Sequence, residues 1–333
     1  MSPIALRLAA LQFFATPFSL ERNLAVAARH AQAAAASAGA RLLLLPALFN
    51  TGYVYAPRLA AAAEAEDGPT VAWLKAHSAG LGLLLGGTLL LRQGGRVYNT
   101  LVLAEPNGRL HQYRQRHPLL WEHGYFNAGR QPLIAETALG RLGLLAGWDA
   151  AHPSAWAAYA GQVDALLLAS AAPRFHRAVL NFPGAHKAYL SQLLPALLRQ
   201  RDALDGLFSA RLAACVAALG VPVIHAAMAG RFVTQVPHPR LSLLAATWRR
   251  PRYWPLAWPA PQASLRASFY GASAIYNGLG QTLASVEDEE GLAVAAVDLG
   301  AGGRPAGPPP GVRLPVEVRV LDLMLRALGR AGG

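Results

Sequence analysis

One stretch of the chain constrains its fold more than any other: residues 141–149, with the sequence Arg-Leu-Gly-Leu-Leu-Ala-Gly-Trp-Asp. A continuous apolar run bounded by glycines is typical of a buried strand. The helical pattern from Ser154 to Ala160 indicates that this strand turns tightly into a helix. In α/β proteins such a corner exposes one side chain at the edge of a sheet, where a catalytic nucleophile is often presented. The residue at this corner is Gly147, which has no side chain.

The same alternation of strand and helix patterns runs along the chain. Residues 6–12 alternate as a strand, and the alanine-rich segment 24–38 that follows has the composition of a helix. Four leucines at 42–45, followed by Pro46, are typical of a central parallel strand that is buried on both faces. This order of elements predicts an α/β fold in which layers of helix cover sheet.

Four segments carry distinctive motifs: Leu-Pro-Ala with a downstream Gly-Tyr at 45–53, Tyr-Arg-Gln-Arg-His at 113–117, Trp-Glu-His-Gly-Tyr-Phe at 121–126 and Gly-Trp-Asp at 147–149. Together they resemble motifs of the carbon–nitrogen hydrolase (nitrilase) superfamily. The resemblance implies a nitrilase-like four-layer αββα sandwich over residues 1–299. Family members are commonly homo-oligomers, so it also implies an oligomer, and a hetero-oligomer with an active enzyme is a further possibility.

The resemblance also places the family's three catalytic residues. In the family a glutamate is the general base, a lysine stabilises the oxyanion and a cysteine attacks the amide or nitrile carbon. Here those positions hold Ala47, Gln115 and Gly147. Alanine cannot transfer a proton, neutral glutamine carries no charge and glycine cannot attack a carbon atom. The expected function is therefore that of an inactive family member, either a small-ligand binder or a non-catalytic subunit. The alternative is a divergent hydrolase of amide, carbamoyl or nitrile substrates with another nucleophile.

Four side chains are candidates for a ligand pocket left at this place: Tyr53, Gln115, Glu122 and Trp148. A polar site with aromatic walls could survive the loss of chemistry, with extra room at the alanine and glycine. The other interpretation is that the cavity has filled. Glu122 itself is either a structural carboxylate or a group that binds an amine or amide of a ligand.

Three further residues have expected structural roles. Asp149 is expected to orient the backbone at the turn, and His117 to make a structural hydrogen bond. Cys215 lies in a segment with helical apolar spacing, which is typical of a small buried core residue. As the only cysteine, it excludes an internal disulfide framework and a multi-cysteine metal site, and it fits a reducing, cytoplasmic location. We expect no cofactor and no metal.

The net charge of +12 raises the question of nucleic-acid binding. Only two of the 30 basic residues are lysines, no basic run is longer than Arg249-Arg250, and zinc-finger spacing is absent. We therefore expect no nucleic-acid partner. No uninterrupted apolar run reaches the roughly 18 residues that span a bilayer, so we also expect no transmembrane segment.

Two insertions near 174–207 and 237–262 are longer than the resemblance suggests. The first is expected to be largely an amphipathic helix from Tyr189 to Leu204. The second contains an arm, residues 248–259, whose prolines favour a loop or extended conformation. The arm could pack on its own domain, contact a protein partner or subunit, or touch a membrane surface. Its candidate contact residues are Trp248, Arg249, Arg250, Tyr253, Trp254 and Trp258. Residues 300–333 are expected to form a Gly/Pro-rich linker and a tail segment.

Overall fold

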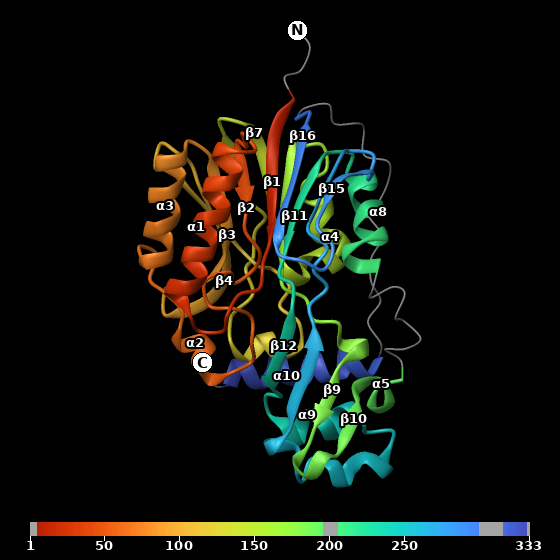
Figure 1. Ribbon diagram of the computed structural model, residues 1–333. Helices are drawn as coiled ribbons and strands as arrows, with labels where there is room; N and C mark the ends of the chain where they lie inside the picture. The colour runs from red at the N-terminus through yellow and green to blue at the C-terminus, as the bar shows by residue number, and fades with distance from the viewer. Residues whose placement is uncertain (1–4, 196–205, 300–315, 332–333) are drawn as a thin grey trace.

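Two six-stranded sheets lie face to face in the computed structural model, which describes residues 5–195, 206–299 and 316–331 (Figure 1). In the first sheet β1, β2 and β3 run parallel, and antiparallel strands complete it on both sides. Its strands, in spatial order, are β16 (Gly291–Val297), β1 (Leu6–Gln12), β2 (Leu42–Leu44), β3 (Leu84–Gln93), β4 (Arg96–Ala104) and β5 (Leu110–Arg114).

The second sheet repeats this arrangement around a parallel centre of β7, β8 and β11. Antiparallel strands again form both edges. Its spatial order is β15 (Thr282–Ser285), β14 (Ala274–Tyr276), β11 (Val223–Ala227), β8 (Ala165–Ser170), β7 (Gly140–Ala146) and β6 (Ile134–Thr137). Buried parallel strands need apolar side chains on both faces, which explains the unbroken apolar runs in the sequence.

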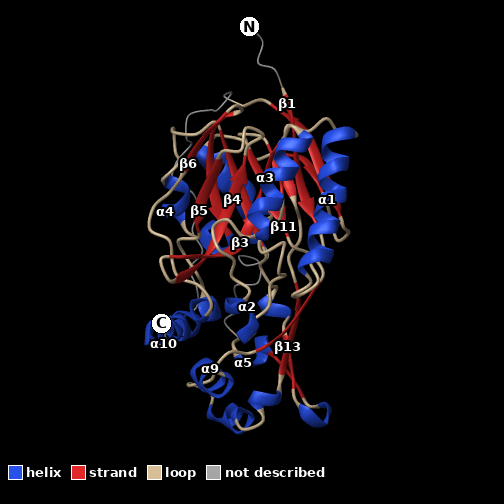
Figure 2. Cartoon of the chain, turned by 90° about the vertical axis from the view of Figure 1, so that its left-hand side faces the viewer, coloured by secondary structure: helices blue, strands red, loops and turns tan. Residues whose placement is uncertain are grey.

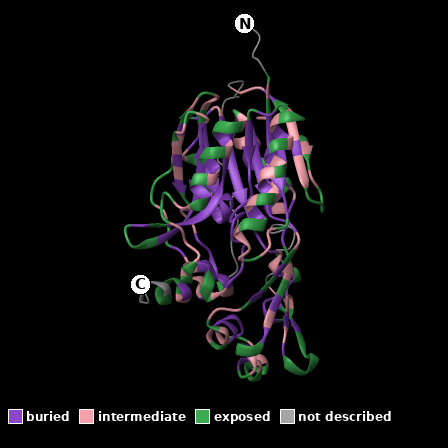
Figure 3. Ribbon diagram, turned by 60° about the vertical axis from the view of Figure 1, so that its left-hand side comes forward, coloured by how far each residue is buried: buried purple, intermediate pink, exposed green. Residues whose placement is uncertain are grey.

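Helices cover the outer face of each sheet. α1 (Leu20–Ala36) and α3 (Pro69–Leu81) pack on the first sheet, and α4 (Pro153–Ala157) and α8 (Ala210–Leu219) lie beside the second (Figure 1). In β1, Ala9 and Leu11 face the α1 and α3 side, whereas Leu8 and Ala10 belong to the core between the sheets. The result is the expected αββα sandwich. Figure 3 shows its strands buried and the outer faces of its helices exposed.

A third, four-stranded sheet extends beyond the sandwich (Figure 2). Its order is β10 (Lys187–Tyr189), β9 (Val179–Asn181), β13 (Ser264–Ser268) and β12 (Arg231–Gln235). We call residues 173–194 and 231–268 the projecting subdomain. Its short helical segments are η3 (Phe175–Arg177), η4 (Pro183–Ala185), α5 (Leu190–Leu193), α9 (Pro239–Ala246), η6 (Pro251–Ala257) and η7 (Ala260–Gln262).

Five of the described helical segments belong neither to the outer layers of the sandwich nor to the projecting subdomain. The longest of them lies at the junction between these two parts. α10 (Val316–Ala331) crosses this junction and packs against α9 and η1 (Figure 1). Val318, Leu321 and Leu325 form its buried side. The others are α2 (Pro57–Ala61), η1 (Leu120–Gly124), η2 (Gly147–Ala151) and η5 (Gly206–Phe208).

Two expectations about the insertions need correction. The helix expected from Tyr189 to Leu204 is limited to α5 in the described part, because Pro195 lacks an N–H and would clash with a preceding carbonyl. Residues 196–205 lie outside the described residues. The arm at 248–259 is not extended: it folds into η6, a 3₁₀ segment that begins with Pro251. A proline at the first helical position loses no hydrogen bond, because the N–H at that position has no partner within the helix. Pro251 can therefore begin a short helical segment even though the arm is rich in proline.

The expected linker at 300–311 also lies outside the described residues, whereas the apolar tail segment forms α10. Among the helices the structure describes, none combines the length and apolarity that crossing a membrane requires.

Candidate functional site

The corner after β7 is built by backbone and by one buried carboxylate. Gly147 has φ of +53°, a left-handed conformation that favours glycine, and it starts η2. Asp149 accepts hydrogen bonds from the Tyr113 hydroxyl at 2.7 Å and from the backbone N–H of His117 at 2.8 Å. Asp149 therefore joins this corner to the end of β5, which is the orienting role that the sequence predicts for it.

Gln115 occupies the space next to the glycine. A β-carbon built on Gly147 would lie 3.0 Å from the Gln115 Oε1 and 3.1 Å from its Nε2, closer than ordinary contact. The amide is fully buried and held in place: Asn99 donates to its Oε1 at 2.7 Å, and its Nε2 donates to a Glu122 oxygen at 3.1 Å. The corner is therefore filled by a neutral, hydrogen-bonded amide.

Ala47 lies at the same edge of the sandwich. Its N–H donates to the Ser170 carbonyl at 3.3 Å, and Ser170 directly follows Ala169, the residue paired with Ala146. The ends of β2, β5, β7 and β8 thus converge, as expected where strands end at one edge of a sheet. The three positions Ala47, Gln115 and Gly147 come together, and none carries a group that can attack, accept a proton or supply positive charge.

Glu122 is the carboxylate that contacts the Gln115 amide at this corner. It is buried and accepts hydrogen bonds from the Tyr53 hydroxyl at 2.6 Å and from Leu119 N–H at 3.0 Å, in addition to Gln115. Tyr53 also shares a hydrogen bond of 2.9 Å with Tyr55. Burial raises the pKa of Glu122 to about 7, although these hydrogen bonds to the carboxylate oppose the rise. Tyr53, Gln115 and Glu122 therefore form a closed polar cluster, in which the Tyr53 hydroxyl and the Gln115 amide both donate hydrogen bonds to the Glu122 carboxylate.

An apolar cavity lies beside this cluster. It offers about 70 Å³ to the centres of water-sized molecules, several times the roughly 10–15 Å³ that one water needs. Trp148, the remaining candidate for the pocket, is one of its walls, so the structure separates Trp148 from the three polar candidates. The walls include Leu119, Trp121, Trp148, Phe175, Leu180, Phe182, Leu190, Leu193, Leu243, Ala246, Leu265, Val318 and Leu321.

The cavity offers almost no polar group to a ligand. The Ser242 hydroxyl on its wall donates to the Pro237 carbonyl at 2.7 Å and accepts from the Trp121 indole at 2.9 Å. Both hydrogen bonds keep that hydroxyl engaged with the protein. An apolar cavity of this kind stays dry and takes apolar ligands.

Helix α10 closes one side of the cavity. Asp322 accepts a hydrogen bond of 2.6 Å from Leu120 N–H and interacts with the His123 Nε2 at 3.1 Å. These contacts hold the carboxylate's pKa below its usual value despite its partial burial. Leu120 has a positive φ of 53°, an unusual conformation for a residue with a side chain, and the bond to Asp322 fixes it. Asp322 thus anchors α10 against η1, where the cavity and the polar cluster meet.

The structural hydrogen bond expected for His117 is present and comes from its backbone. Its backbone N–H, rather than its ring, makes the hydrogen bond to Asp149, and the ring stacks on His152 with centroids 4.0 Å apart. Within the described chain the ring's Nε2 is buried without a hydrogen-bond partner. Burial, His152 and nearby arginines lower the pKa of His117 to about 4, so the ring is neutral at physiological pH.

Cys215 lies in α8 as a buried core residue, as its helical spacing predicts. Burial raises the pKa of its thiol to about 11, which suppresses the reactive thiolate. No three His, Cys, Asp or Glu side chains gather in residues 5–195, 206–299 and 316–331 in a way that could hold a metal ion.

A serine–histidine pair beside Ala47 is absent from the sequence-based candidates. The Ser170 hydroxyl, at the end of β8, and the His225 Nε2, in the middle of β11, share a hydrogen bond of 2.8 Å. Both residues are buried, His225 stacks on Phe208, and burial lowers its pKa to about 4. The available signal was one polar residue in each of two apolar strand runs, on neighbouring parallel strands. A serine hydroxyl and a histidine can act as a nucleophile and its base, but both of these side chains are almost fully buried.

A family model described as carbon-nitrogen hydrolase matches residues 7–304 of the chain. Among curated proteins the chain is 28% identical to the omega-amidase YafV of Escherichia coli over 47% of this chain and 57% of that protein. It is 33% identical to the chloroplastic omega-amidase of Arabidopsis thaliana over 33% of this chain and 34% of the relative. The chain thus spans between a third and somewhat more than half of the length of these relatives.

Solved structures match over a larger share. A crystal structure of an amidase from Nesterenkonia sp. has a TM-score of 0.63 at 21% identity and covers 90% of this chain and 92% of that one. XC1258 from Xanthomonas campestris, a CN-hydrolase superfamily protein, has a TM-score of 0.61 at 21% identity and covers 87% and 89%. At this identity the likeness shows the shared sandwich fold.

Proposed function

This chain belongs to the carbon–nitrogen hydrolase family, and on that premise we propose that it is a non-catalytic member that binds a small, uncharged apolar ligand. The single observation that carries the proposal is the filled corner. Gln115 lies against Gly147 and is hydrogen-bonded to Asn99 and Glu122, where the family's resemblance places the catalytic cysteine and lysine.

The chemistry supports this proposal. In a catalytic set that acts as a unit, removing the nucleophile alone can cost on the order of 10⁶ in rate, and further losses then add little. Gly147 cannot form a covalent intermediate, and Ala47 cannot return a proton to a leaving amine. Glu122 titrates near neutrality but is committed to Tyr53, Gln115 and Leu119 N–H.

The ligand class follows from the cavity. Its walls are mostly aliphatic and aromatic, and the Ser242 hydroxyl on them is engaged with Trp121 and Pro237. A charged or strongly polar ligand would lose its hydration there without gaining hydrogen bonds, at a cost of several kcal/mol. A hydrocarbon-like molecule would bury apolar surface at about 25 cal/mol per Å².

A second candidate function is amide hydrolysis through Ser170 and His225. Two observations favour it: the hydroxyl–imidazole contact of 2.8 Å beside Ala47, and relatives named omega-amidases. The pair lies beneath Phe208, away from the cavity walls, so a substrate would require that region to open. We therefore rank this function second.

We also propose that the protein forms an oligomer, either with itself or with an active family member, and that it is located in the cytoplasm. The first rests on the family's common behaviour and the second on the single cysteine. Neither is needed for the binding activity.

The binding proposal is tested with xenon, an uncharged apolar atom small enough for a cavity of about 70 Å³. We expect a saturable shift of the xenon NMR signal with the wild-type protein. Ala246→Leu, which adds volume at the cavity wall, should weaken xenon affinity at least about tenfold. Ala267→Leu on β13, which lies outside the cavity wall, is the matched control and should leave affinity unchanged. Absence of saturable binding, or equal loss in both variants, contradicts the proposal.

A further inference from the structure

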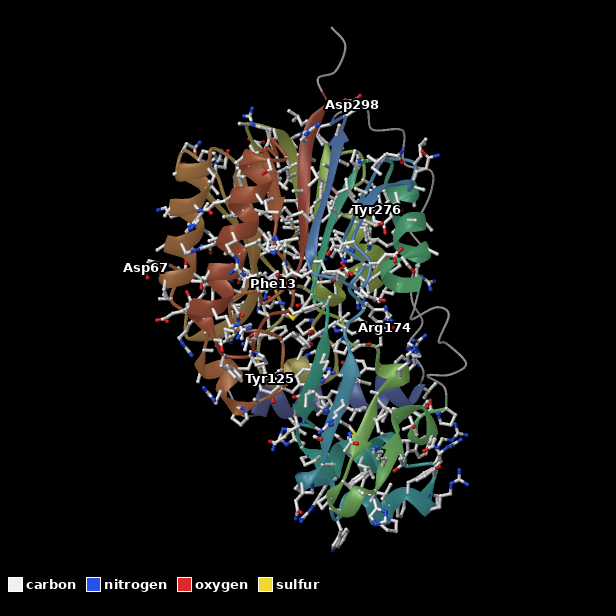
Figure 4. All side chains as sticks on the ribbon, in the orientation of Figure 1. Phe13, Asp67, Tyr125, Arg174, Tyr276 and Asp298 are labelled. Atoms are coloured by element: carbon white, nitrogen blue, oxygen red, sulfur yellow. The ribbon has the colours of Figure 1, made fainter. Side chains whose placement is uncertain are left out.

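The charge of the molecule is concentrated in one part. The projecting subdomain, residues 173–194 and 231–268, contains nine Lys and Arg residues and no Asp or Glu. The rest of the chain has 21 basic and 18 acidic residues and is close to neutral. Most of the basic side chains of the subdomain are exposed, and they are Arg177, Lys187, Arg231, Arg240, Arg249, Arg252 and Arg266. Most of the net charge of +12 is therefore carried by one projecting body. Figure 4 shows the side chains of this body as sticks, below the sandwich.

Three tryptophans protrude from the same body. Trp248 is 50% exposed, Trp254 45% and Trp258 77%, although large aromatic side chains are usually covered in a folded domain. Trp254 and Trp258 join Leu244, Pro251 and Pro255 around a shallow apolar depression. These residues belong to α9, to η6 and to the turns beside them, at the lower end of the subdomain in Figure 1.

Arginines are interleaved with these rings. The guanidinium of Arg249 lies 5.4 Å from the centre of the Trp248 ring, and that of Arg252 lies 4.8 Å from the Tyr253 ring. The Trp254 indole N–H donates to the Thr247 carbonyl at 3.2 Å, so the polar edge of this ring is engaged by the protein. We call Trp248, Arg249, Arg252, Trp254 and Trp258 the Trp–Arg tip.

Exposed tryptophans beside exposed arginines suit the surface of an anionic lipid bilayer better than a nucleic acid. Tryptophan settles at the boundary between lipid headgroups and acyl chains, and exposed arginines attract anionic lipid at about a fivefold gain in affinity each. A nucleic-acid groove would need polar donors along its floor, whereas Leu244 and two prolines line this depression. The absence of any carboxylate among residues 173–194 and 231–268 leaves nothing there to repel an extended negative surface.

We propose that the Trp–Arg tip docks the protein on anionic lipid bilayer surfaces. The indoles insert at headgroup depth, and the arginines pair with lipid phosphates. The attachment is peripheral, and it leaves the sandwich and the cavity on the solvent side. This activity is independent of ligand binding in the cavity.

Flotation of the full-length protein with vesicles tests the proposal. We expect binding to vesicles of phosphatidylcholine with about 25% phosphatidylglycerol, little binding to pure phosphatidylcholine, and a steep decrease between about 50 and 500 mM salt. Trp254→Ala/Trp258→Ala and Arg249→Gln/Arg252→Gln should each weaken binding at least about tenfold. Circular dichroism should show that both variants keep the wild-type fold, because the altered side chains are largely exposed.

Matched controls lie on the sandwich. Arg22→Gln/Arg29→Gln on α1 removes the same charge from exposed positions, and Leu279→Ala removes an apolar side chain that is 73% exposed. Both should leave vesicle binding unchanged. Three results would overturn the proposal: no binding to anionic vesicles, equal losses in tip and control variants, or binding to duplex DNA under conditions where vesicles are not bound.

Discussion

The amide of Gln115 lies where a side chain on Gly147 would have to go, with its oxygen 3.0 Å from the position of a β-carbon on that glycine. The glycine at one position and the glutamine at the other therefore depend on each other sterically. The glycine leaves room for a glutamine that the surrounding hydrogen bonds hold in a single position.

This contact predicts a specific cost for Gly147→Ala. The left-handed φ alone should cost about 1 kcal/mol for alanine, and overpacking against the Gln115 amide should add about 1–3 kcal/mol. Gly161 is the matched control because it also has a positive φ, of 70°, but nothing lies within 4 Å of the place that a β-carbon on it would occupy. Urea unfolding should show a larger loss for Gly147→Ala than for Gly161→Ala. Equal losses would mean that the corner has room for a side chain.

Glu122 gives the fold a defined pH dependence. Its carboxyl has a pKa of about 7 when folded and an ordinary value of 4.5. Between these values the folded state holds a proton that the unfolded chain has released, so stability is greatest below about pH 4.5 and falls as the pH rises to about 7. The full contribution is on the order of 3 kcal/mol.

Glu122→Gln should flatten this part of the stability profile. Glutamine does not titrate and fills the same volume beside Tyr53 and Gln115. The remaining slope should come from Asp149, whose pKa burial also raises, to about 6. Urea midpoints measured from about pH 4.5 to pH 8 on both proteins provide the check. Identical slopes would show that Glu122 is ionised throughout this range.

Asp322 should control how firmly α10 covers the cavity. Asp322→Ala removes the acceptor for Leu120 N–H and His123, which should cost about 1.5–3 kcal/mol and speed hydrogen exchange across η1. Asp322→Asn keeps an acceptor oxygen and should lose less. Exchange rates at Leu120 that are the same in wild type and Asp322→Ala would show that α10 is held by its apolar side alone.

The fold was predictable because its central strands are buried on both faces. The leucine run at 42–45 and the apolar run ending at Gly147 can be satisfied only inside a helix-covered sheet. The assignment of the family's catalytic positions to Ala47, Gln115 and Gly147 stays a prediction from the resemblance, and it rests on neighbouring residues that match the family's motifs. The orienting role of Asp149 was predictable from its place at the turn, but its partners Tyr113 and His117 lie 36 and 32 positions away in the chain.

The long-range features could not be read from sequence. Trp148 directly follows Gly147 and Glu122 contacts Gln115, yet Trp148 lines the apolar cavity and Glu122 belongs to the polar cluster. The walls of that cavity come from β9, α9 and α10, whose packing no local pattern specifies. The Ser170–His225 contact likewise joins residues 55 positions apart. Of the helix expected from Tyr189 to Leu204, the described part is α5, which ends at Leu193 before Pro195, and residues 196–205 lie outside the described residues.

The most direct test of the central claim is ammonia release from a panel of amides that includes 2-oxoglutaramate. An omega-amidase relative serves as the positive control, and Ser170→Ala is assayed beside the wild type. The account predicts that the wild-type protein releases no ammonia above the buffer rate at any substrate or protein concentration. Release that rises in proportion to wild-type protein would contradict it. Loss of that release in Ser170→Ala would identify the serine as the nucleophile.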